Sequence, residues 1–192
     1  MPDPNPEAMS FLLTRRSRPA KTLTTPVPDR AAISILLAAA ARTPDHGKLE
    51  PWRFIVLGKP ALARLAGLIP VRGAALQIDP DKIAKAQDQY GSADLAIAVV
   101  SSPKPSDKVP QIEQIYSAGA VCLALLNAAL ASGWGANWLS GWASHDRDFI
   151  RDGLGLEDHE SIAGFIHIGT ETSAPPDRPR PDLGMITTWV AA

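Results

Sequence analysis

Two arginines and a serine in succession, Arg15, Arg16 and Ser17, with Arg18 after them, form the clearest candidate for an anion site. Guanidinium groups bind phosphate through paired hydrogen bonds, and a neighbouring hydroxyl adds another donor. The preceding segment, 7–14, has the pattern of a helix, and cations at the end of a helix also complement its dipole. The sequence therefore leaves two interpretations open, a phosphate site and an ordinary helix terminus.

A second polar cluster runs from Arg42 to Phe54 and contains His46 and Glu50. It joins the expected end of one helix to the expected start of a strand through a loop with Pro44 and Gly47, residues that break helices. Taken by itself, this cluster is a connection that carries polar groups.

Familiar motifs elsewhere in the chain are incomplete. Gly133 and Gly135 begin a dinucleotide fingerprint, but Trp138 stands at its third glycine position. The segment from Trp138 to Trp142 has tryptophan at both glycine positions of a nucleophile elbow. These departures argue against a Rossmann site and a serine hydrolase.

A metal site is not expected either. His145, Asp146 and His159 could be combined into one on paper, but helix-cap and loop residues flank them, which favours a solvated surface. The sequence has no His-Glu-x-x-His helix and no pair of cysteines.

The elements that must position these residues alternate between helical and extended patterns. Asp29 is placed to cap a helix over 31–42, and two apolar runs, 52–57 and 94–101, predict central strands. Further helices are expected at 61–69, 80–90, 110–132 and 144–151, with a strand at 162–169. The sequence predicts an α+β fold.

Composition favours one globular domain over residues 1–192. The chain has 192 residues, of which 45% are hydrophobic, and its 19 basic and 20 acidic side chains nearly balance. That balance gives nucleic acid no broad electrostatic footprint. A single cysteine, Cys122, and an N-terminus without an apolar leader lead us to expect a cytoplasmic protein.

The uncharged stretch from Gln114 to Ser144 raises the question of a membrane. Its apolar part, 118–131, contains Asn127 and is too short to span a bilayer, so we expect no membrane association. This helix carries small residues on every side and little polar surface, which favours its burial at a subunit interface. The proline-rich segment 170–192 predicts an extended C-terminal arm whose apolar end docks on a partner.

Taken together, these segments resemble successive landmarks of the nitroreductase family of flavin enzymes, and of its short bacterial NAD(P)H nitroreductase subgroup. The landmarks cover nearly the whole chain in order. They are Arg15 to Ser17, Arg42 to His46, Glu50 to Phe54, Lys108 to Pro110, Glu113 to Gly119, Gly133 to Gly141 and Gly164 to Thr170.

The resemblance implies a mixed sheet wrapped by helices, an intertwined homodimer, and FMN at the dimer interface. It implies that Arg15, Arg16 and Ser17 hold the FMN phosphate, ribityl chain and pyrimidine edge. Arg42 and His46 would contact the flavin from their loop, either within their own chain or across the dimer. Further implied contacts are Trp138, Leu139 and Ser140 for FMN, and Ala128, Ala129, Leu130, Ala131, Ser132 and Gly133 for NAD(P)H.

Two residues depart from the pattern of the family. Leu139 stands where a relative has arginine, and Glu50 replaces the more common glutamine before Pro51 and Trp52. In the arm, Arg178 or Arg180 could add a phosphate contact or remain a surface arginine.

The implied activity is transfer of hydride from NAD(P)H through flavin N5 to a nitroaromatic, a quinone or a similar small oxidant. One site would serve both substrates in a ping-pong mechanism, with Arg16 stabilising negative charge near flavin N1 and no protein nucleophile. Two alternatives stay open: an FMN-binding protein without useful turnover, and an enzyme of the same fold that fragments flavin or removes halogen.

Overall fold

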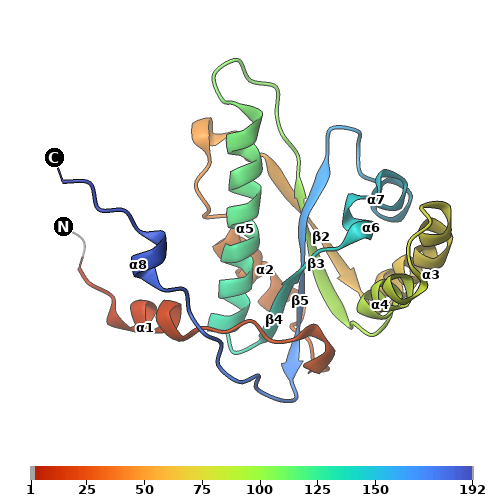
Figure 1. The fold of residues 1–192 in the computed structure, drawn as a ribbon, viewed down its shortest axis with the longest axis horizontal. Helices are drawn as coiled ribbons and strands as arrows, with labels where there is room; N and C mark the ends of the chain where they lie inside the picture. The colour runs from red at the N-terminus through yellow and green to blue at the C-terminus, as the bar shows by residue number, and fades with distance from the viewer. Residues whose placement is uncertain (1–2, 192) are drawn as a thin grey trace.

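The computed structural model describes residues 3–191 and has one sheet between two layers of helices (Figure 1). The longest strand, β5 (Ser161–Glu171), pairs with β3, β4 and β1, and β3 also pairs with β2. The other strands are β1 (Leu23–Thr24), β2 (Trp52–Gly58), β3 (Leu95–Ser101) and β4 (Gly135–Leu139).

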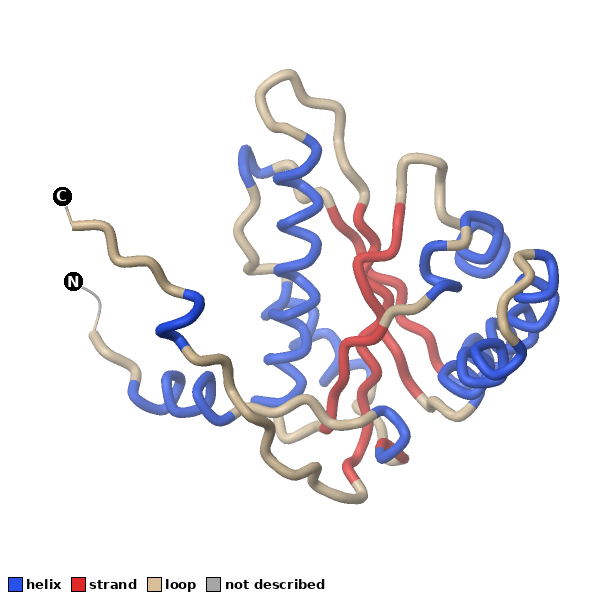
Figure 2. Tube along the Cα trace, in the orientation of Figure 1, coloured by secondary structure: helices blue, strands red, loops and turns tan. Residues whose placement is uncertain are grey.

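The helices cover the two faces of the sheet (Figure 2). One face carries α2 (Arg30–Ala40) and α5 (Gln111–Ala131). The other carries α3 (Lys59–Ala75), α4 (Pro80–Gly91), α6 (Trp142–His145) and α7 (Arg147–Leu154). This arrangement confirms the α+β class.

The strand β3 shows why the sheet is central. All seven of its residues are buried, and they alternate between the two cores. Ile97 and Val99 pack toward α2 and α5, whereas Ala98 and Val100 pack toward α3 and α7. The continuous apolar run in the sequence is therefore a strand covered on both faces.

The pairing within one chain is antiparallel throughout the described strands. Gly58, at the end of β2, lies opposite Leu95, at the start of β3, because the α3–α4 connection returns the chain to the same end of the sheet. The described strands therefore form an antiparallel sheet, and the mixed sheet that the resemblance implied is wrong for this part of the chain.

Two helices replace the single helix expected over 144–151. The break falls at Asp146, whose side chain accepts a hydrogen bond from Phe149 N at 3.2 Å and so caps the start of α7. The strand β4 was not predicted, because its segment is rich in glycine and tryptophan and lacks a clear alternating pattern.

The ends of the chain extend away from the body on the side of α5 (Figure 1). They comprise α1 (Pro6–Thr14) and the C-terminal arm, residues 172–191, which contains α8 (Leu183–Ile186). Outside α8, the arm forms no helix or strand over these residues. Its apolar side chains, Leu183, Met185, Ile186, Trp189 and Val190, are strongly exposed in the single chain.

Among the described helices, α5 alone is long and apolar enough to cross a membrane. It packs instead against the sheet and α2, with Val121, Cys122 and Leu125 fully buried. This burial is typical of a core helix. Its outer side still exposes Ile112, Ile115, Tyr116 and Leu123.

Candidate functional site

The arginine segment begins where α1 ends. Arg15 is the C-terminal cap of α1, and its backbone N–H donates to Phe11 O at 2.7 Å. The chain then runs extended, and Arg18 N donates to Ala136 O of β4 at 2.8 Å. The segment is therefore fixed at both ends, by the helix and by the sheet.

A cavity of about 370 Å³ opens beside this segment. Arg15, Arg16 and Arg18 lie on one side of it, and Leu130 and Gly133 at the end of α5 lie on another. The resemblance implied that Arg15 and Arg16 bind FMN and that Leu130 and Gly133 bind the nicotinamide nucleotide, whereas Arg18 was not among the expected contacts. The structure brings members of both groups to one cavity.

The charges around this cavity are unevenly compensated. Arg18 Nε pairs with Glu171 Oε2 at 2.7 Å. By contrast, Nε of Arg15 and Nε of Arg16 are both buried and have no hydrogen-bond partner among the described residues. A buried donor without a partner is costly, so these two groups are suited to an acceptor that the chain itself does not supply.

The pKa of Arg15 is lowered, first by burial and then by the positive charges of Arg180 and Arg16. Arg180 of the arm therefore lies close enough to repel Arg15. The positive charges of Arg16 and Arg180 beside Arg15 favour the binding of an anion here, because a bound negative charge would relieve their repulsion of Arg15. An arginine that only complements the dipole of α1 would need neither the neighbouring Arg180 of the arm nor the burial of Arg15.

The serine of the motif lies within the same group. Arg15 Nη2 donates to Ser17 Oγ at 2.9 Å. Because the hydroxyl accepts this hydrogen bond, its own proton is free to be donated to a ligand.

The strand β4 presents the next group of expected contacts. Trp138 is 37% exposed, Leu139 is half-buried and Ser140 is exposed. Gly135 and Ala136 are buried, so the strand enters the core and then emerges at its C-terminal end. Of the expected nicotinamide segment, Ala129 is fully buried in the core, and its side chain faces the sheet.

His46 lies in a different place from the arginine cavity, and Arg42 is not among the residues that line that cavity. His46 Nδ1 is 2.6 Å from Glu113 Oε2, in the first turn of α5, whereas Leu130 of the arginine cavity is near the end of α5. Leu130 follows Glu113 by 17 positions along the helix, which correspond to about 25 Å at 1.5 Å per residue. One chain therefore does not bring His46 to the Arg15 cavity.

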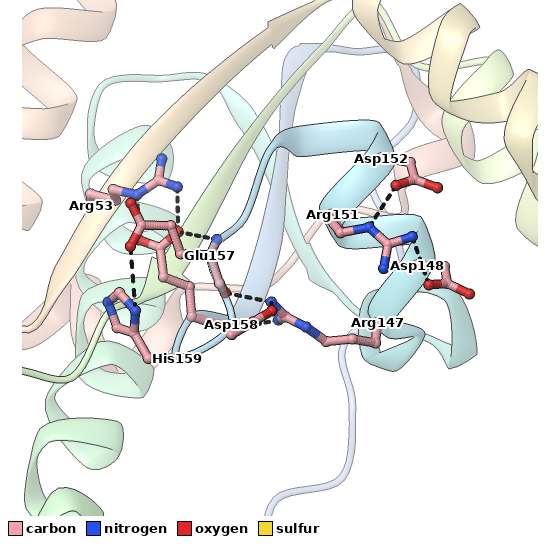
Figure 3. A network of polar contacts seen from close by, with 9 residues as sticks. Arg53, Arg147, Asp148, Arg151, Asp152, Glu157, Asp158 and His159 are labelled. Atoms are coloured by element: carbon pink, nitrogen blue, oxygen red, sulfur yellow. Dashed lines mark hydrogen bonds and ion pairs between the residues drawn. The ribbon is translucent and has the colours of Figure 1, made fainter.

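Arg53, from the second sequence cluster, has a structural role (Figure 3). Its Nε and Nη2 each donate to a carboxylate oxygen of Glu160 at 2.6 Å. This bidentate contact is the main cause that lowers the pKa of Glu160 to about 2. Arg147 adds a hydrogen bond to Glu160 O at 2.8 Å, so the loop before β5 is held from two sides.

The residues once considered for a metal are engaged elsewhere. Asp146 accepts hydrogen bonds from Arg72 at 2.6 and 3.0 Å, and His159 lies 3.5 Å from Glu157. Among the described residues, no group of three His, Cys, Asp or Glu side chains is placed to hold a metal ion.

The surroundings of Glu113 and His167 were not predicted from the sequence. Glu113 stands in one of the family landmarks, and its contact with His46 joins residues 67 positions apart, so no local pattern reveals it. His167 lies in the apolar run of β5 and is 1% exposed. Its burial could have been inferred from its place in that run.

The comparison with known protein families decides the affiliation. The sequence model of the Nitroreductase family matches residues 12–170. The chain belongs to the nitroreductase family. The expected affiliation is thus confirmed, and with it an oxidoreductase as the class of enzyme.

Known relatives of this nitroreductase agree. The Escherichia coli K12 protein named "Putative NAD(P)H nitroreductase YdjA" is 34% identical over 164 residues, which cover 85% of this chain and 88% of that protein. A nitroreductase-like family protein from Bacillus cereus has a TM-score of 0.79 at 22% identity, covering 99% of this chain and 98% of that chain. The FMN and NADPH-dependent nitroreductase NfnB from Sphigopyxis sp. strain HMH has a TM-score of 0.73 at 20% identity, covering 96% and 99%. The two structural likenesses show the fold.

Proposed function

We propose that this nitroreductase is a single-domain, FMN-dependent oxidoreductase that takes hydride from NAD(P)H and passes it to a nitroaromatic, a quinone or a similar small oxidant. The observation that carries the proposal is the pair of buried, unpartnered Nε atoms of Arg15 and Arg16 beside an open cavity. The names of its relatives, which include NAD(P)H and FMN, agree with this choice of cofactor and donor. The cytoplasm, which supplies NAD(P)H, is the proposed compartment.

The donors around the cavity fit a flavin with one phosphate. Arg15, Ser17 and Arg180 can bind the phosphate, because two guanidinium groups and a hydroxyl supply several donors at one point. Arg16 is then left for the pyrimidine edge. Within residues 3–191, no other arginine has a buried side-chain nitrogen without a hydrogen-bond partner, so the additional phosphate of FAD has no second site of this kind.

When bound, FMN supplies the redox chemistry, receiving hydride from one substrate and delivering it to the next. The protein contributes position and charge. Arg16 holds a positive charge where electron density increases on reduction, and charge-assisted hydrogen bonds contribute about 1.5–3 kcal/mol each. Leu130 and Gly133 limit the space in which the nicotinamide ring and the oxidant can lie.

We further propose a homodimer in which each site contains residues of both chains. His46 is about 25 Å along α5 from the Arg15 cavity of its own chain, so it would contact the flavin of the partner, together with Arg42 from the same segment. The exposed apolar side chains of α5 and of the arm supply the surface that such a partner would cover. Trp138, Leu139 and Ser140 would complete the pocket from β4.

Three measurements on the purified protein test the proposal. Mass spectrometry of the heat-released cofactor should identify FMN, and FAD or the lack of flavin after reconstitution would contradict it. Sedimentation at micromolar concentration should give a dimer, and deletion of residues 175–192 should lower dimer stability and flavin retention together. A monomer that still retains FMN would overturn the shared site.

Rapid reduction of the bound flavin by NAD(P)H, reversible in oxygen, would distinguish a reductase from a flavin carrier and from a flavin-fragmenting enzyme.

A further inference from the structure

The loop that carries His46 makes a direct contact with the start of α5. His46 Nδ1 lies 2.6 Å from Glu113 Oε2, a distance typical of a strong hydrogen bond to a carboxylate. A carboxylate can only accept, so the proton of this bond resides on Nδ1. The other ring nitrogen, Nε2, has no hydrogen-bond partner among the described residues and is free for a ligand.

The backbone of this loop is held in an unusual conformation. Gly47, Lys48 and Glu50 have φ values of 80°, 55° and 50°, in the left-handed region that Lys and Glu rarely adopt. Such residues cost free energy and persist where the surrounding structure holds them. Asp45 supplies one restraint by accepting a hydrogen bond from Leu49 N at 2.6 Å.

A second anchor ties the same loop to the next turn of α5. Ser117 Oγ donates to Pro44 O at 3.0 Å and accepts from Trp52 Nε1 at 3.1 Å. Ser117 follows Glu113 by four residues, so both project from one side of the helix. The loop is thus fixed on α5 at Pro44 and at His46.

The anchored imidazole borders a hollow of about 480 Å³, which Tyr116 and Ala120 of α5 also line. In the single chain the side chains of His46 and Glu113 are 59% and 44% exposed. Water competes with a hydrogen bond between two side chains this exposed, so the bond by itself adds little stability to the fold. Its role would instead be to orient the His46 ring for a further contact.

We propose that Glu113 is a positioning residue for His46: it holds the ring with the proton on Nδ1 and presents Nε2 to the flavin bound by the partner subunit. The inference rests on the proposed function, because the flavin and the dimer are part of it. Glu113 itself acts through His46 and does not touch the flavin. The orientation of a ring nitrogen by a carboxylate on the opposite side is a general way to fix the role of a histidine.

A second His–Glu contact in the chain provides a matched control. His159 Nδ1 and Glu157 Oε2 are 3.5 Å apart, and their side chains are 49% and 75% exposed (Figure 3). This contact lies in the loop before β5, away from the hollow beside His46. Glu157→Gln should therefore leave both the His46 ring and flavin affinity unchanged.

The first experiment reads the tautomer directly in the flavin-free protein. Nitrogen NMR of labelled histidine, at about pH 8 where an ordinary imidazole is neutral, should show His46 protonated at Nδ1. Its signals are assigned by their loss in His46→Gln. Glu113→Leu and Glu113→Asp should both shift His46 toward the Nε2-protonated form, because leucine has no acceptor and the shorter aspartate carboxylate no longer reaches Nδ1. A tautomer that is unchanged in both variants would overturn the proposal.

The second experiment is a double-mutant cycle on FMN affinity, measured by quenching of flavin fluorescence. His46→Gln should weaken binding about tenfold and Glu113→Gln about three- to tenfold. The double variant should bind within about twofold of His46→Gln alone, since Glu113 acts only through the ring. Additive losses would show that Glu113 contributes independently and would overturn its positioning role.

The two experiments separate this inference from the proposed function. If the wild-type protein binds no FMN, the proposed function fails, and with it the statement that Nε2 faces a flavin. The tautomer, measured without flavin, would still decide whether Glu113 holds His46. If FMN binds through Arg15 but His46→Gln has no effect on affinity, the flavin site stands and the contact across the dimer is wrong.

Discussion

The indole of Trp138 occupies the space that a side chain at position 164 would need. A Cβ on Gly164 would overlap Nε1 of Trp138 and come within 2.5 Å of its Cδ1. Trp138 lies opposite Ile166 in the antiparallel pairing of β4 and β5, and its ring extends over the neighbouring glycine. The absence of a side chain at Gly164 therefore determines where this tryptophan lies.

Gly164→Ala is expected to displace the indole. The added methyl overpacks a filled site, which costs about 1–3 kcal/mol, and moves Trp138 from the place proposed for flavin contact. Tryptophan fluorescence should change and FMN affinity should fall. Gly67→Ala in α3 is the control, because a Cβ there meets nothing within 4 Å and alanine favours a helix. A fluorescence spectrum like that of the wild type would show that Trp138 adapts without moving.

The arginine cluster predicts a graded loss of flavin affinity. Arg15→Ala should weaken FMN binding more than Ser17→Ala, because it removes a charged bidentate partner, whereas Ser17→Ala removes one neutral donor. Arg180→Ala should also weaken it, since Arg180 lies close enough to Arg15 to lower its pKa. Arg178→Ala, two residues earlier in the arm, is the matched control. Equal affinities for the Arg180 and Arg178 variants in flavin titrations would remove the arm from the site.

Local patterns in the sequence predicted most elements, because apolar periodicity and caps act within a few residues. The cap at Asp29 is one example: its side chain accepts from Ala32 N at 2.8 Å, at the start of α2. The short strand β4 was not predicted, because its glycine and tryptophan fit poorly to an alternating pattern. Its pairing with β5 stabilises it, and that pairing is not visible in the local sequence. The 2.6 Å contact between His46 and Glu113 is formed by tertiary structure, so no local pattern could predict it.

The Arg53–Glu160 pair predicts a loss of stability in acid. Glu160 is almost fully buried, and Arg53 lowers its pKa from 4.5 to about 2. A carboxylate with a lowered pKa stabilises the fold above about pH 4.5, and this contribution is lost as the pH falls toward 2. Arg53→Met should reduce the free energy of unfolding by about 1–3 kcal/mol at neutral pH, a range that allows for partial exposure of Arg53.

Urea unfolding at several pH values checks this prediction. The difference between the wild type and Arg53→Met should shrink between about pH 4.5 and 2, because protonation of Glu160 ends the ion pair in the wild type. A difference that stays constant over this range would mean that Arg53 stabilises the loop by packing alone.

His167 predicts a separate loss at milder acidity. Its ring is buried between the register neighbours Ala96 and Asn137, neither nitrogen has a partner among the described residues, and burial lowers its pKa from 6.5 to about 4. The folded protein therefore keeps the ring neutral where the unfolded chain takes up a proton. The free energy of unfolding is therefore highest above about pH 6.5, and it falls by about 3 kcal/mol as the pH drops to 4.

Replacement of the ring should remove this dependence. In His167→Leu, the free energy of unfolding should vary little between pH 6.5 and 4, whereas the exposed His145→Gln should keep the slope of the wild type. If His167→Leu keeps that slope, another group is responsible for it.

The shared cavity predicts how the two substrates alternate. Arg15 and Arg16, proposed for FMN, line the same hollow of about 370 Å³ as Leu130 and Gly133, proposed for the nicotinamide nucleotide. Hydride transfer requires each substrate within about 3–3.5 Å of the reacting atom, so NAD(P)H must leave before the oxidant enters. Initial rates should give parallel double-reciprocal lines, and intersecting lines would rule out a single pocket.

Arg16 tests the charge in that pocket. Arg16→Gln replaces a half-buried guanidinium with a neutral amide, so it should slow reduction by NAD(P)H more than it slows reoxidation, because only reduction adds negative charge beside this residue. Stopped-flow absorbance measures the two half-reactions separately, with Arg178→Gln as the surface control. If the Arg16→Gln enzyme is reduced as fast as the wild type, the compensating charge comes from another residue, and Arg180, close to Arg15 in the same cluster, is the next to replace.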